Sequence, residues 1–176
     1  MNIRTTVKSA TYAVVKAFSP ATGAQPEDTD LLDTLKSEHD EVKGLLADLV
    51  DADTATQRRA LVRQIKAALV PHTKAEQKVL YDAIIALKDK EVQIDGHEGY
   101  LEHELADKAL QKLGSISNAT SPEHKAVAKV LKELVEHHIK EEERNVWGDA
   151  RKHFSAEERA QMNTAYLAAR SRVKVR

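Results

Sequence analysis

The chain has 176 residues, with 27 Lys and Arg against 28 Asp and Glu and a formal net charge of −1. That length suits one sizeable domain, and the scarcity of glycine (6), proline (4) and aromatic residues (4%) is typical of an all-helical protein. The absence of cysteine excludes disulfides, iron–sulfur clusters and cysteine nucleophiles, so any metal must be held by histidine and carboxylate. The near-neutral charge gives no indication of nucleic-acid binding, and no apolar run approaches the roughly 20 residues of a transmembrane segment. We therefore expect a cytoplasmic all-α protein.

The first segment, residues 1–29, predicts an amphipathic helix followed by a linker. Residues 1–19 carry three basic side chains and no acid, and Ile3, Val7, Val14 and Phe18 lie on one helical stripe. We favour a short helix packed on the rest of the chain or on a partner protein, with a membrane-surface helix or a targeting peptide as alternatives. Pro20 to Pro26 then indicate the linker.

Four long helices are predicted between residues 30 and 150. The first covers about 30–51, and the second runs from the capping box Thr54-x-x-Gln57 to about residue 88, with a kink at Pro71. A third is expected to open at the capping box Asp95-x-x-Glu98 and to end at Gly114. The fourth runs from Ser121-Pro122 to about Trp147. Short loops between such helices favour an up-down-up-down antiparallel four-helix bundle.

The last segment, residues 151–176, predicts a fifth helix and a basic tail. The capping box Ser155-x-x-Glu158 opens a helix that reaches about Arg172. Arg170, Arg172, Lys174 and Arg176 are interpreted as solvated charge, with docking on an acidic partner or on lipid headgroups as the alternative.

One histidine falls on the apolar stripe of each long helix: His39, His72, His103 and His138. Glu76 and Glu142 follow two of them by four residues, which places each pair side by side on one helix face. Buried carboxylates without partners are costly, so a metal-free core would need a complete hydrogen-bond network. The donor set suits iron, manganese or zinc, and two bridging carboxylates suit two divalent ions. His137, turned about 100° from His138, is the rival ligand in the fourth helix.

As a set, these motifs resemble the hemerythrin-like, or HHE cation-binding, domain over about residues 30–150. The matching stretches are SEHDEVKGLL, PHTKAEQKVLY, YLEHELADKAL and EHHIKEEERNVW. The resemblance implies a four-helix bundle around a non-haem di-iron centre, its two irons joined by an oxo or hydroxo bridge. By the same resemblance, His39 and His72 hold one iron, His103 and His138 hold the other, and Glu76 and Glu142 bridge them.

The sequence departs from the oxygen carriers of that family at Gly99. Carriers have a second histidine four residues before the third-helix ligand, so one coordination position here is left for water, an oxygen ligand or substrate. Tyr100 and Asp107 are candidate substitutes. The change argues against a simple reversible O2 carrier, and Gly99→His is expected to restore the donor. The glutamate at position 142, where the carriers have aspartate, lengthens one bridge.

Two classes of function remain open from the sequence. In the first, a reactive iron centre meets O2, peroxide or NO, senses them, or handles iron. In the second, the bundle is a metal-responsive regulatory or interaction module whose occupancy controls the binding of a protein partner through the terminal helices. No cysteine and no glycine-flanked serine indicates nucleophilic catalysis, and hydrolysis by a zinc form is the remaining enzymatic alternative.

Overall fold

The computed structural model describes residues 29–175, and within that range every regular element is a helix. The elements are α2 (Leu31–Asp51), α3 (Ala55–Glu76), the π-helical η1 (Gln77–Tyr81), α4 (Asp82–Ile85), α5 (Lys90–Ser115), α6 (Pro122–Arg144), α7 (Val146–His153) and α8 (Ala156–Arg170). The prediction of an all-helical protein is thereby confirmed. The amphipathic helix predicted for residues 1–19 lies outside the described residues.

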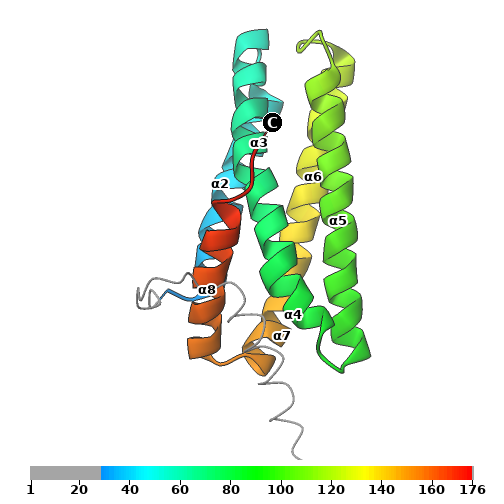
Figure 1. The fold of residues 1–176 in the computed structure, drawn as a ribbon. Coiled ribbons are helices and arrows are strands. Elements are labelled where there is room, and N and C mark those ends of the chain that lie inside the picture. The colour runs from blue at the N-terminus through cyan, green and yellow to red at the C-terminus, as the bar shows by residue number, and fades with distance from the viewer. Residues whose placement is uncertain (1–28, 176) are drawn as a thin grey trace, which may run out of the picture.

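The four long helices α2, α3, α5 and α6 lie side by side, and neighbours in the chain run in opposite directions (Figure 1). Contacts join α2 to α3, α3 to α5, α5 to α6 and α6 back to α2, so the four helices enclose one interior. The C-terminal helix α8 packs along α2 and α3, and α7 contacts α5 and α6. No helix in the described part of the chain is both long enough and apolar enough to span a membrane.

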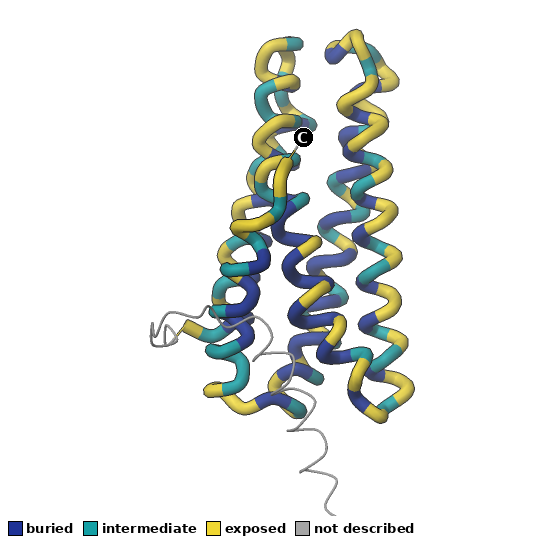
Figure 2. The backbone as a smooth tube through the Cα atoms, viewed as in Figure 1, coloured by how far each residue is buried: buried dark blue, intermediate teal, exposed yellow. Residues whose placement is uncertain are grey.

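Buried positions alternate with exposed positions along all four helices (Figure 2), and a polar layer divides the interior. Along α2, Leu35 belongs to one cluster of buried apolar residues and Val42 to another, and His39 lies between them. Along α3, His72 lies in the same way between Leu69 and Ala75. The histidines therefore occupy the middle of the fold, with apolar packing on both sides that holds the helices at fixed positions.

The predicted helix ends are partly right. Two of the three predicted capping boxes, Thr54 with Gln57 and Ser155 with Glu158, are present, and α3 continues through Pro71 as one helix. The fourth helix ends at Arg144, and Gly148 lies inside α7. The remaining correction concerns the third helix.

The capping box predicted at Asp95 and Glu98 is wrong. Helix α5 begins at Lys90, because the side chain of Asp89 accepts a hydrogen bond from the backbone N–H of Glu91 and so caps the helix earlier. Asp95 and Glu98 consequently lie inside α5, with side chains free for another role. Gly96 and Gly99 also become interior helix positions, each close to a neighbouring side chain.

The π-helical turn η1 follows directly after Glu76 and ends at Tyr81. A π-helical turn adds one residue to the ordinary helical repeat and is frequent at functional sites. Here it brings Tyr81 into the interior, where the side chain is fully buried. No pattern in the sequence predicts this turn.

Candidate metal centre

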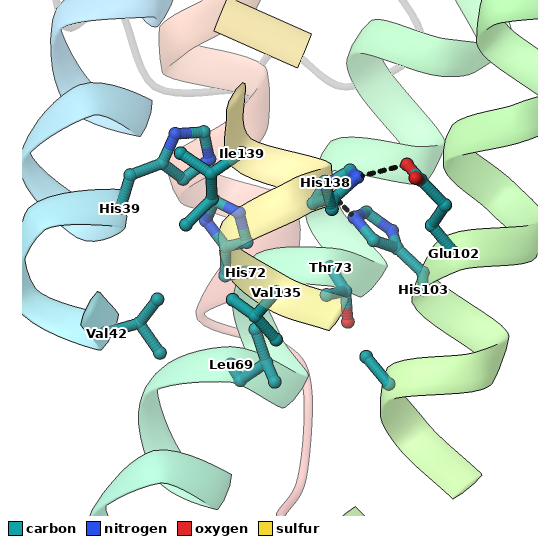
Figure 3. Close-up of a pocket in the computed structure, with 11 residues that line it drawn as sticks. His39, Val42, Leu69, His72, Thr73, Glu102, His103, Val135, His138 and Ile139 are labelled. Atoms are coloured by element: carbon teal, nitrogen blue, oxygen red, sulfur yellow. Dashed lines mark hydrogen bonds and ion pairs between the residues drawn. The ribbon is translucent and has the colours of Figure 1, made fainter. Parts of the chain in front are cut away.

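Six side chains from the four long helices meet in the polar layer. They are His39 from α2, His72 and Glu76 from α3, His103 from α5, and His138 and Glu142 from α6, and none is more than 7% exposed. Figure 3 shows the four imidazoles turned toward the same interior space. The structure thus brings together all six residues that the sequence singled out, although their role as metal ligands remains a prediction.

Five of the six side chains form two groups of three that share Glu76. One donor atom from each of His39, His72 and Glu76 lies within 4.8 Å of the others, and the same holds for Glu76, His103 and His138. Oε2 of Glu76 is 3.4 Å from Nε2 of both His72 and His103. Oε2 of Glu142 is 3.3 Å from Nε2 of His39 and 3.8 Å from Nε2 of His138. Each carboxylate therefore lies between one histidine of each pair, which is the arrangement required of a bridge.

The buried donors lack the hydrogen bonds that such atoms ordinarily make. Both carboxylate oxygens of Glu76 and of Glu142, and Nε2 of His39, are buried without a hydrogen-bond partner among the described residues. Leaving a buried carboxylate without compensation is expensive, whereas a divalent cation would compensate several oxygens at once. The exception is a hydrogen bond between Nε2 of His103 and Nε2 of His138, which are 3.0 Å apart. That is the separation expected of neighbouring ligands at about 2.1 Å from one ion. The donor set and its geometry fit a metal ion.

Carboxylates hold the outer nitrogen of three of the four imidazoles. Nδ1 of His39 lies 3.1 Å from Glu143, Nδ1 of His72 lies 2.9 Å from Glu38, and Nδ1 of His138 lies 2.7 Å from Glu102. Because a carboxylate only accepts, each of these Nδ1 atoms carries a proton, which leaves Nε2 as the nitrogen that can give a lone pair to a metal ion. The sequence analysis missed all three acids. Their signal is adjacency in the chain, since each directly precedes or follows one of the six donors.

Two side chains of helix α8 contact Glu38, one of these three carboxylates. The Tyr166 hydroxyl donates to Glu38 and lies 3.1 Å from Nδ1 of His72. Nε of Arg170 is 3.1 Å from Oε1 of Glu38. Arg170, the first basic residue of the predicted tail, therefore forms an ion pair with Glu38, the carboxylate that holds His72. The expectation that all four tail charges are solvated is wrong for this residue.

The protonation of the histidines is asymmetric. Burial disfavours the charged form of His72, but the carboxylates of Glu76 and Glu38 outweigh it and raise the pKa to about 10. Burial lowers the pKa of His103 to about 4, and the nearby His138 acts in the same direction. Burial and the neighbouring Glu76 raise the pKa of Glu142. In the metal-free protein a proton on His72 thus balances part of the buried negative charge.

Tyr81 fills the space beside Gly99. A Cβ atom at position 99 would lie 2.5 Å from Cζ of Tyr81, so the glycine allows the phenol ring to enter the site. The ring lies 5.3 Å from that of His103, and the Tyr81 hydroxyl is buried without a hydrogen-bond partner in the described chain. Burial, then the charges of Glu142 and Glu76, raises the pKa of Tyr81 well above its ordinary value, so the hydroxyl keeps its proton. Tyr81 is a functional candidate that the sequence analysis missed.

The two substitutes named from the sequence are wrong. The Tyr100 hydroxyl donates to the backbone oxygen of Gln77 and to Asp82, away from the six donors. Asp107 pairs instead with Lys74, at 3.4 Å. In α6, the side chain of His137 is 62% exposed, so His138 is the histidine that faces the interior.

An apolar wall closes one side of the centre. A pocket against the four histidines is lined on this side by Val42, Leu69, Ala106, Val135 and Ile139, and Thr73 and Glu102 complete its lining (Figure 3). Such a surface admits small neutral molecules more readily than ions, because ions lose hydration there without compensation.

Known proteins support a cation-binding domain. A family model described as "Hemerythrin HHE cation binding domain" matches residues 30–150. A curated protein from Nostoc sp. (strain PCC 7120), named DNA nickase, is 26% identical over 168 residues, which cover 92% of this chain. The chain spans 47% of that relative's length. No solved structure matches.

Proposed function

Because the chain belongs to the hemerythrin HHE cation-binding domain family, we propose that it binds two iron ions in its interior and reacts with or senses O2, peroxide or NO, or handles iron. His39 and His72 hold one ion, and His103 and His138 hold the other. Glu76 and Glu142 bridge the pair, at the core of the up-down-up-down antiparallel four-helix bundle that we infer from the helix contacts. Zinc and manganese are the alternative metals.

One observation carries this proposal. Glu76 and Glu142 are 0% and 2% exposed, have no hydrogen-bond partner for their carboxylate oxygens within residues 29–175, and each contacts imidazoles from both sides of the centre. Two such carboxylates next to each other repel, and one protonated histidine offsets only part of that charge. Two divalent cations would offset it, and the carboxylate–imidazole distances of 3.3 to 3.8 Å support the proposal that each carboxylate contacts both cations.

Bound iron would supply a redox-active Lewis acid. The chain's own residues orient and protect it. Glu38, Glu102 and Glu143 fix the tautomer of three imidazoles, so that Nε2 points inward. The apolar wall excludes bulk water while admitting diatomic molecules. The Tyr81 hydroxyl, protonated and free of a partner, is the one uncharged O–H donor described beside Glu142, and it can give a hydrogen bond or a proton to a small ligand.

Tyr81 favours reaction over reversible O2 carriage. In the carriers that this family includes, an imidazole occupies the position that Gly99 leaves to the Tyr81 ring. Replacing a nitrogen donor by a proton donor promotes reduction of a bound oxidant over its release, because protonation stabilises the reduced oxygen.

The test is anaerobic loading with Fe(II), followed by exposure to O2, peroxide or NO with visible absorption recorded over time. We expect rapid, irreversible oxidation by O2 or peroxide. Tyr81→Phe should slow it without changing the iron content. A stable O2 complex that releases O2 under vacuum would identify the protein as a reversible O2 carrier. Activity of the zinc-loaded protein equal to or higher than that of the iron-loaded protein would overturn the preference for iron.

The contacts of α8 support a second candidate, a metal-responsive module. Tyr166 and Arg170 both bind Glu38, and Glu38 binds His72, so one hydrogen-bonded chain joins the centre to the C-terminal helix. Metal binding removes the proton that makes His72 a cation, which weakens its pull on Glu38. Hydrogen exchange of α8 that differs between metal-free and metal-loaded protein would favour this reading, and identical exchange would remove it.

The name of the Nostoc relative raises DNA nicking as a question for this chain. The burial of the six donors argues against it, since the phosphodiester of a duplex cannot reach groups at most 7% exposed. Incubating iron-loaded protein with supercoiled plasmid tests the point. Conversion to open circles that is lost in Glu76→Ala would assign nicking to this centre.

A further inference from the structure

A second pocket opens on the α5 and α6 side of the centre, and we call it the acidic pocket. Its lining includes five carboxylates, Asp95, Glu98, Glu102, Glu141 and Glu142, together with Tyr81 and Gly99. These acids form a gradient of burial: Glu98 is exposed, Asp95, Glu102 and Glu141 are intermediate, and Glu142 is buried. The acidic pocket therefore leads from solvent to one of the six donors of the centre.

The outer acids lack positive partners. No hydrogen bond or ion pair within residues 29–175 engages the side chain of Asp95 or Glu98, whereas Glu141 pairs with Arg144 and Glu102 with His138. Burial, followed by repulsion from Asp149, Glu98, Glu91 and Glu141, raises the pKa of Asp95. Carboxylates that lie close together without cations repel one another and destabilise the fold, so a positively charged ligand would bind here favourably.

The inner end of the acidic pocket carries an independent sign of a ligand. The Tyr81 hydroxyl and both carboxylate oxygens of Glu142 are buried without a hydrogen-bond partner among the described residues, and both residues line this pocket. They are unsatisfied polar atoms at the point where the acids meet the centre. The pocket with the apolar wall has one carboxylate in its lining, Glu102, and that carboxylate is already bound to His138, whereas the acidic pocket has five.

We infer that the acidic pocket is the route by which divalent cations reach the centre, with Asp95 and Glu98 as the first, transient binding site and Glu142 as the point of delivery. This inference rests on the proposed metal function and deepens it. Carboxylates bind hydrated divalent ions and exchange them readily, and a cleft lined by one sign of charge raises on-rates by roughly 10- to 1,000-fold. The two pockets then admit different ligands: cations enter through the acidic pocket, and small neutral ligands enter through the pocket with the apolar wall.

The test measures the rate of metal uptake by the metal-free full-length protein. Stopped-flow mixing with Co(II), followed by its visible bands, gives a second-order rate constant, and anaerobic Fe(II) repeats it with the proposed metal. Asp95→Asn/Glu98→Gln should lower this rate constant about 10-fold and weaken its dependence on ionic strength, while the final metal content stays unchanged. Glu98→Lys, an exposed position, should slow uptake further.

The matched control is Asp48→Asn/Glu133→Gln. It makes the same chemical changes at two exposed positions that do not line the acidic pocket. Its net charge therefore equals that of the Asp95→Asn/Glu98→Gln variant. Uptake in this control should follow the unmodified protein. Equal rates in all proteins, with normal metal content, would refute the route and leave the metal function standing. Failure of the unmodified protein to take up metal would instead refute the metal function.

Discussion

Replacing Gly99 by alanine tests the contact that sets this centre apart from the carriers. The new Cβ would lie 2.5 Å from Cζ and 2.6 Å from Cε2 of Tyr81. Ordinary carbon contacts begin near 3.5 Å, so the ring or α5 must move by about 1 Å. The ring has little freedom, because it is fully buried between the rings of His103 and Tyr100. Overpacking of this kind costs about 1–3 kcal/mol, partly offset by about 1 kcal/mol of better helix propensity.

We therefore expect Gly99→Ala to lower the free energy of unfolding by up to about 2 kcal/mol, and Tm by up to about 8 °C at roughly 2–4 °C per kcal/mol. The assay is thermal unfolding of the metal-free protein by circular dichroism. Gly44→Ala is the control, because nothing lies within 4 Å of a Cβ there, and it should raise Tm slightly. If Gly99→Ala matched Gly44→Ala in stability, Tyr81 would not occupy this space.

The remaining predictions concern the donors and their supports. Glu76→Ala or His72→Ala should sharply lower metal content measured by mass spectrometry, because each removes a donor from the shared cluster; unchanged content in both would refute the ligand assignment. Glu38→Gln should weaken metal affinity about 10- to 100-fold in a competition titration, since it loosens His72, and unaltered affinity would count against that support. The pKa of His72 is raised to about 10 from 6.5, so its stabilisation of the metal-free protein is complete below pH 6.5 and is lost as pH rises through 10. Metal binding should release this proton at pH 7–8, which a pH-indicator dye measures, and no release would contradict the assignment.

The same clash corrects what Gly99→His was expected to do. An imidazole at position 99 meets the Tyr81 ring before it reaches the centre, so the single variant should lose stability without gaining a donor. Gly99→His/Tyr81→Ala makes room for it, and this double variant should change the visible spectrum of the iron-loaded protein. A changed spectrum in the single variant, with full stability, would show that the Tyr81 ring moves aside easily.

The six central donors could be predicted because periodicity decides which face of a helix is buried. Apolar residues lie three or four positions away from His39 and from His138 along their helices. Such a pattern predicts that the histidine is buried, whichever helix packs against it. It also separated His138 from the exposed His137. All-helical architecture followed in the same way from composition and caps.

Tyr81 could not be predicted, because its position depends on a π-helical turn and on space left by Gly99, which lies 18 residues further along the chain. Glu38, Glu102 and Glu143 resemble ordinary surface acids in the sequence, and only the packing of a second helix turns each toward a histidine. The start of α5 was misplaced since two capping patterns compete there, and the earlier one, at Asp89, forms. Interactions between helices decide all these features, and periodicity within one helix does not contain them.

The most direct test of the central claim is metal counting combined with Mössbauer spectroscopy on protein reconstituted anaerobically with Fe(II) and then oxidised. Glu76 and Glu142 each contact imidazoles of both groups, so two irons held there must be linked. The account predicts two iron ions per chain whose ferric spins are magnetically coupled, with Glu76→Ala losing both the second ion and the coupling. One iron per chain, or two that are magnetically independent, would contradict it.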